Sequence, residues 1–208
     1  MNANPTFLNG AKIIPVLSVT DLEDAVPLAK ALVAGGLKYL EVTLRTDVAY
    51  DAIARMSESV PDAIVGVGSV RFVSELERAV AVGAQFAVSP GAERALIEAG
   101  LESPIPFLPG AATASEVMTL LAAGYSFQKF FPAEINGGVP ALKAFSGPLG
   151  QVSFCPTGGV KPENALDYLN LSNVVCVGGS WMVPQQAVAE KNWQEIESLS
   201  QKAASLTS

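Results

Sequence analysis

The sequence contains no histidine, only two cysteines, and fewer basic than acidic residues among its 208 positions. The absence of histidine removes the commonest general base near neutral pH and the commonest transition-metal ligand. Any catalysis must therefore rest on lysine, carboxylate, cysteine, tyrosine or hydroxyl groups. Cys155 and Cys176 lie in separate apolar runs without CxxC spacing, which is typical of reduced core residues.

The charge balance and the lack of long apolar runs exclude further classes of partner. The 13 basic and 20 acidic residues give a net charge of −7 without a basic cluster, so we expect no nucleic-acid partner. The N-terminal stretch "MNANPTFLNG" has neither the basic nor the apolar part of a secretory signal. The longest uncharged stretch, Tyr168–Ala189, is interrupted by polar residues and Pro184, so we expect no membrane partner and a cytoplasmic location.

What the sequence does contain is a regular alternation of strand and helix patterns. Eight β-rich runs begin at residues 12, 39, 63, 86, 105, 126, 152 and 174, with helical patterns between them. Before the first of these helices, "TDLE" predicts a capping box with Thr20 as N-cap and Glu23 at N3. The alternation predicts an α/β fold, a (β/α)8 TIM barrel, with an open doubly wound sheet as the alternative. We expect one domain over residues 1–208, in which residues 1–10 form a short lead-in.

Side-chain alternation in the second run favours the barrel. Residues on one side are aliphatic: Leu40, Val42 and Leu44. Residues on the other side are polar: Glu41, Thr43 and Arg45. A strand inside an open doubly wound sheet is apolar on both faces, whereas barrel enzymes place polar groups inside, at the C-terminal ends of the strands.

The most informative residue is Lys129, in "FQKFFPAEING", where it shares one strand face with Phe127 and Phe131. A lysine there either reaches the surface or a carboxylate, or serves as a nucleophile, because burial favours the neutral amine that attacks carbonyls. Glu41 is its natural complement as a proton-transfer group. The rival partner for Glu41, Arg45, is about 13 Å away along an extended strand, and at the strand end it suits a bidentate grip on a substrate carboxylate.

Two pairs of glycines end the seventh and eighth runs, in "CPTGGV" and "VGGSW". Glycine lets backbone N–H groups approach an oxyanion, and the loops after strands seven and eight of this fold commonly hold phosphate. Turn glycines are the alternative for either pair alone. The stretch "GVGSVR" lacks the third glycine of a dinucleotide fingerprint, so it predicts no nucleotide site.

Five motifs along nearly the whole chain resemble those of one enzyme family: "EVTLRT", "SPG", "KFFPAE", "FCPTGG" and "GGSW". They are similar to the bifunctional 2-keto-3-deoxy-6-phosphogluconate (KDPG) / 4-hydroxy-2-oxoglutarate (KHG) aldolases. The resemblance implies a class I aldolase on a (β/α)8 barrel, usually a homotrimer, which needs no metal or other cofactor. It further implies a small phosphorylated keto acid as substrate, cleaved to pyruvate and glyceraldehyde 3-phosphate in the Entner–Doudoroff pathway.

The resemblance also implies residue roles. Lys129 is the Schiff-base lysine, Glu41 the acid/base, and Arg45 the grip on the pyruvyl carboxylate. Four residues shape the substrate pocket: Ser69, Pro90, Phe131 and Thr157. Four hold the phosphate: Gly158, Gly159, Gly179 and Ser180. Ser69 stands where the family often has threonine, and Ala111 and Ala112 stand where a hydroxyl is expected.

Two enzyme alternatives and one binding alternative stay open at this point. A sibling specificity for the 6-phosphogalactonate epimer would need the same residues. A metal-free phosphosugar isomerase would use Glu41 for enediol chemistry and would form no imine with Lys129. A phosphometabolite-binding protein would keep the glycines but has no need of an interior lysine and glutamate.

Overall fold

The computed structural model describes residues 5–8 and 10–206, so of the predicted lead-in residues 1–4 and 9 lie outside the described part. The strands are β1 Ile13–Leu17, β2 Tyr39–Thr43, β3 Ile64–Gly68, β4 Ala87–Val88, β5 Phe107–Leu108, β6 Gly110–Ala111, β7 Phe127–Phe130, β8 Ser153–Pro156 and β9 Val177–Gly179. The helices are η1 Pro5–Leu8, η2 Leu22–Asp24, α1 Ala25–Ala34, α2 Ala49–Ser59, α3 Val73–Ala81, α4 Arg94–Glu102, α5 Ala114–Ala122, α6 Gly138–Phe145, α7 Pro162–Leu169, α8 Gln185–Ala189 and α9 Trp193–Ser205.

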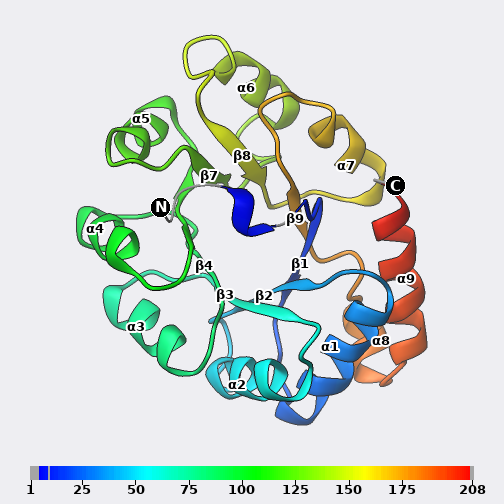
Figure 1. Ribbon diagram of the computed structural model, residues 1–208. Helices are drawn as coiled ribbons and strands as arrows, with labels where there is room; N and C mark the ends of the chain where they lie inside the picture. Colours follow the sequence, from blue (N-terminus) through cyan, green and yellow to red (C-terminus); the bar gives the residue numbers. More distant parts are fainter. Residues whose placement is uncertain (1–4, 9, 207–208) are drawn as a thin grey trace.

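The strands form a curled parallel sheet with the helices outside it (Figure 1). One part has the order β5-β4-β3-β2-β1-β9 and the other the order β6-β7-β8. β5 and β6 are one predicted strand divided at Pro109, whose missing N–H interrupts the ladder while its carbonyl accepts from Lys129 N at 2.8 Å. Isolated parallel bridges, Phe154 with Val174 and Thr157 with Gly178, join the β8 and β9 segments.

Apolar side chains form two separate clusters on the two faces of the sheet. The larger lies between strands and helices and includes Leu40, Val42 and Phe130. The smaller fills the interior and includes Tyr39, Phe86, Phe127 and both cysteines. η1 lies inside the curl of the sheet (Figure 1), and its residue Leu8 is fully buried. The predicted alternation along β2 and β7 is therefore confirmed: Glu41 and Lys129 point to the interior.

The predicted capping box at Thr20 is wrong. Asp21 is the N-cap instead, and its side chain accepts from Glu23 N at 3.0 Å, one position later than expected. A 3-10 helix precedes α1, so the spacing of an ordinary capping box does not apply. Among the described residues, no helix is both long and apolar enough to cross a membrane.

Candidate active site

The interior carries a buried lysine–glutamate pair. Lys129 Nζ, from β7, donates to Glu41 Oε1, from β2, at 3.0 Å. The two side chains are only 6% and 4% exposed, so neither charge is hydrated from bulk water. Lys129 Nζ also lies 5.4 Å from the centre of the Phe131 ring. Transfer of one proton from the ammonium to the carboxylate gives a neutral amine, which is a nucleophile, beside a carboxylic acid, and carbonyl attack requires this arrangement.

The Cys176 thiol does not compete for this role. Cys155 and Cys176 are both free and buried, as the sequence predicts. Burial raises the pKa of the Cys176 thiol, and its neighbour Cys155 raises it further. A protonated thiol is a poor nucleophile, so Cys176 is not a candidate for carbonyl attack.

Gly68 provides the space that the Glu41 carboxylate occupies. It belongs to β3, which pairs with β2 in parallel register. A Cβ at Gly68 would lie 2.6 Å from Glu41 Cγ and 2.8 Å from Glu41 Cδ, too close for any side chain to fit without displacing the carboxylate. Sequence reasoning did not single out this glycine, because its function depends on a neighbouring strand.

Gly68→Ala should therefore lower kcat by about 100-fold, the effect of misplacing a group in an active site by about 1 Å. Steady-state kinetics together with the thermal midpoint would measure the effect. Gly147→Ala is the matched control, since a Cβ at Gly147 meets nothing within 4 Å. Equal kcat values in the two variants would show that the position of Glu41 is not set by Gly68.

Arg45 and Ser180 lie on a common cavity of about 470 Å³ at the ends of β2 and β9. Both residues are exposed, and Ser18, Thr20 and Asp24 line the same space. The Asp24 carboxylate is nearly buried there, with Oδ1 3.6 Å from Lys191 Nζ. Sequence reasoning assigned none of these three residues to a site, although the hydroxyls of Ser18 and Thr20 follow β1 closely.

Pro90 and Phe131 line a second cavity, of about 440 Å³, together with Ala111 and Ala112. Lys129 and Glu41 line neither of the two cavities. Phe131 lines the second cavity, and its ring centre is 5.4 Å from Lys129 Nζ, so it connects that cavity to the lysine–glutamate pair.

Glu116 also contributes to the wall of the second cavity. The N–H groups of Ala112 and Thr113 donate to the Glu116 carboxylate and hold its pKa below the usual value.

The remaining predicted residues lie at the ends of β3, β8 and β9. Thr157 is buried, and its bridge to Gly178 brings the ends of β8 and β9 side by side. Gly158 and Gly159 have φ of 98° and 82°, in the region that favours glycine. Ser69 has φ of 63°, so the residue after β3 turns sharply at the sheet edge. Among the described residues no group of three or more potential ligands could hold a metal ion.

An interior amine beside a carboxylate, on parallel strands surrounded by helices, is the arrangement of an α/β enzyme that acts on carbonyl compounds. The sequence matches the model of the KDPG and KHG aldolase family over residues 5–199. The chain therefore belongs to the KDPG and KHG aldolase family, and it is an aldolase.

Named relatives and solved structures agree with this assignment. The chain is 50% identical to the KHG/KDPG aldolase of Escherichia coli K12 over 198 residues, which are 95% of this chain and 93% of that protein. It is 46% identical to the 2-dehydro-3-deoxy-phosphogluconate aldolase of Pseudomonas aeruginosa over 198 residues, 95% and 90% of the two chains. The KDPG aldolase of Legionella pneumophila, captured with pyruvate as a covalent carbinolamine intermediate, superposes with a TM-score of 0.91 at 49% identity, covering 93% and 94%.

Proposed function

We propose that this aldolase cleaves 2-dehydro-3-deoxy-6-phosphogluconate to pyruvate and glyceraldehyde 3-phosphate, and also acts on 4-hydroxy-2-oxoglutarate. The observation that carries the proposal is the interior pair, with Lys129 Nζ 3.0 Å from Glu41 Oε1. The substrates are supported by the E. coli relative named KHG/KDPG aldolase, at 50% identity over nearly the whole chain. The carbinolamine in the Legionella pneumophila enzyme supports an imine mechanism.

Lys129 begins the reaction as a neutral amine that attacks the C2 ketone of the substrate. The carbinolamine loses water, with a proton from Glu41, and becomes an iminium that withdraws electrons from the C3–C4 bond. Glu41, now a carboxylate, removes the proton of the C4 hydroxyl as that bond breaks. The aldehyde leaves, and Glu41 returns its proton to C3 of the enamine, which becomes the methyl group of bound pyruvate. Water then hydrolyses the iminium and frees the lysine.

The other predicted residues would bind the two ends of the substrate. Arg45, at the end of β2, would hold the carboxylate next to C2 by bidentate hydrogen bonds. The pocket around the ketone would be completed by Ser69, Pro90, Phe131 and Thr157. The phosphate would lie against the backbone of Gly158, Gly159 and Gly179 and the hydroxyl of Ser180. The positive φ angles of Gly158 and Gly159 favour a turn whose N–H groups can meet an anion.

The same proposal includes the closed barrel, the oligomeric state, the location and the pathway of the enzyme. A closed eight-stranded TIM barrel in a single domain is supported by the division of one strand at Pro109 and by the two bridges between the β8 and β9 segments. The homotrimer is proposed from the family resemblance, and the exposed apolar side chains of Phe72, Met118 and Ile135 are candidates for its interface. A phosphorylated sugar acid as substrate favours a cytoplasmic enzyme of the Entner–Doudoroff pathway.

Borohydride reduction in the presence of pyruvate, followed by intact mass and peptide mapping, tests the mechanism. We expect one pyruvyl adduct per chain, located on Lys129. Pyruvate release from the phosphorylated and the unphosphorylated substrate, measured in parallel, tests the specificity. A folded protein without an adduct would exclude the imine mechanism. Preferential cleavage of the galactonate epimer would show that this epimer is the substrate instead.

A further inference from the structure

A tyrosine–glutamate contact connects the segment after β7 with the helix after the glycine turn. Tyr168, on α7, is fully buried, and its hydroxyl donates to Glu134 Oε1. Glu134 follows β7 by four residues and belongs to the segment that carries Phe131. Burial raises the pKa of Tyr168, and the carboxylate of Glu134 raises it further, so the hydroxyl remains a proton donor at neutral pH.

Glu134 lies directly against the Gly158–Gly159 turn. Its backbone N–H donates to Gly158 O at 3.1 Å, and the preceding Ala133 N–H donates to Thr157 O at 2.8 Å. The stem of its side chain fills the position of a side chain at Gly159, since a Cβ there would lie 2.5 Å from Glu134 Cγ and 2.7 Å from Cβ. The turn therefore rests on Glu134, and Tyr168 holds Glu134 in place.

A third residue holds the turn from its other side. Asn164, also on α7, donates to Gly159 O at 3.2 Å and accepts from Lys161 N at 2.8 Å. Helix α7 thus fixes the turn in two ways, through Asn164 on its carbonyl and through Tyr168 on the glutamate beneath it. Loss of the tyrosine hydroxyl would free a carboxylate beside N–H groups that are to bind an anion.

We propose that Tyr168 and Glu134 are positioning residues that set the phosphate affinity of the Gly158–Gly159 turn without taking part in the carbon–carbon chemistry. The proposal rests on the proposed function for the identity of the anion, a phosphate ester. The freed carboxylate would repel the phosphate, and the turn would lose its fixed position. Both effects should act on the phosphorylated substrate, because only that substrate carries the phosphate that the turn is proposed to bind.

Tyr168→Phe tests this, because it removes only the hydroxyl. We expect KM for the phosphorylated substrate to rise about tenfold, as for the loss of one hydrogen bond to a charged group, with kcat nearly unchanged. KM for 4-hydroxy-2-oxoglutarate and the rate of pyruvate capture on Lys129 should stay at parental values. Glu134→Gln keeps the acceptor for Tyr168 and removes the charge, so its KM for the phosphorylated substrate should not rise.

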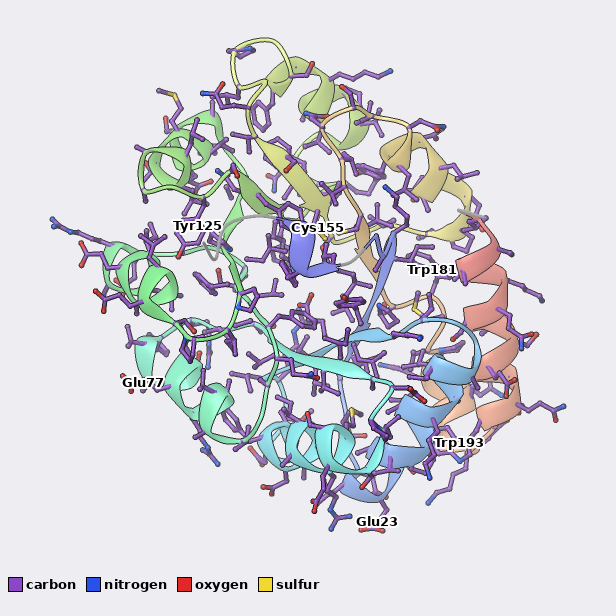
Figure 2. The ribbon with its side chains drawn as sticks, viewed as in Figure 1. Glu23, Glu77, Tyr125, Cys155, Trp181 and Trp193 are labelled. Atoms are coloured by element: carbon purple, nitrogen blue, oxygen red, sulfur yellow. The ribbon has the colours of Figure 1, made fainter. Side chains whose placement is uncertain are left out.

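Tyr125→Phe is the matched control. Tyr125 is also fully buried, and its hydroxyl donates to Ile97 O at 2.9 Å. It lies near α4 and α5, away from α7 (Figure 2). Each variant removes the one hydrogen bond that a fully buried tyrosine donates, so Tyr125→Phe shows what a general loss of stability does to KM. A KM increase for both substrates in Tyr168→Phe, or an equal increase in Tyr125→Phe, would overturn the proposal.

Calorimetry with inorganic phosphate measures the anion affinity of the Gly158–Gly159 turn without any catalytic reaction. The positioning role is supported if the parent protein binds phosphate, Tyr168→Phe binds it about tenfold more weakly, and Tyr125→Phe binds it as the parent does. If that pattern occurs in a protein that does not cleave the phosphorylated keto acid, the proposed function fails and the positioning role stands. Cleavage by the parent with unchanged phosphate affinity in Tyr168→Phe refutes the positioning role alone.

Discussion

Lys129→Met is expected to abolish covalent capture of pyruvate and to lower kcat for cleavage by roughly 10⁴-fold or more, as for loss of a nucleophile. Methionine fills a similar volume but cannot form the imine, so every later step loses its electron-withdrawing group. The measurement is pyruvate release under saturating substrate, together with borohydride reduction and intact mass. Lys143→Met, on the exposed side of α6, is the control and should keep both activities.

The same variant also changes stability, and this effect must be separated from the chemistry. Removing the ammonium leaves the Glu41 carboxylate buried without its donor, and breaking one side of a buried ion pair costs about 3–5 kcal/mol. Lys129→Met combined with Glu41→Gln removes both charges, and its free energy of unfolding should recover toward the parental value. Activity should stay absent in the double variant. Cleavage that returns with stability would show that Lys129 is structural.

The interior face of the sheet could be predicted from sequence because strand alternation is local. Glu41 and Lys129 each share a face with their second neighbours along the chain, and the structure places both faces inside. Their contact joins residues 88 positions apart, so its 3.0 Å distance could not be read from either motif alone. The sequence did predict that the amine of Lys129 and the carboxylate of Glu41 face the same apolar interior and complement each other there.

Features that depend on neighbouring strands or helices were not predictable. The space at Gly68 exists because β3 pairs with β2, and the contact between Glu134 and Tyr168 joins residues 34 positions apart. The misplaced N-cap at Thr20 has a local cause, since Asp21 and Thr20 are both good capping residues and the 3-10 geometry selected the aspartate. Pro109 likewise divides a strand whose composition looks continuous.

Glu41→Gln is expected to separate proton transfer from imine formation. The amide oxygen can still accept the hydrogen bond that Lys129 now gives to Glu41 Oε1 at 3.0 Å, so the lysine should keep its position. The amide cannot take up the proton of the C4 hydroxyl, and kcat for cleavage should fall by about 10²–10⁴-fold, as for loss of a general acid–base group. Pyruvate capture on Lys129 should persist at a reduced rate.

Exchange of the methyl protons of pyruvate with deuterium, followed by NMR, isolates the step assigned to Glu41. The parent should exchange them, because the enamine and the iminium interconvert through a proton shuttle, and Glu41→Gln should exchange them at least about 100-fold more slowly. Glu98→Gln, which removes an exposed carboxylate paired with Arg94 at 2.8 Å, should behave as the parent. Parental exchange in Glu41→Gln would assign the shuttle to another group. Slow exchange together with persistent capture would show that the buried pair divides two functions. Lys129 would form the covalent bond to pyruvate, and Glu41 would transfer the proton.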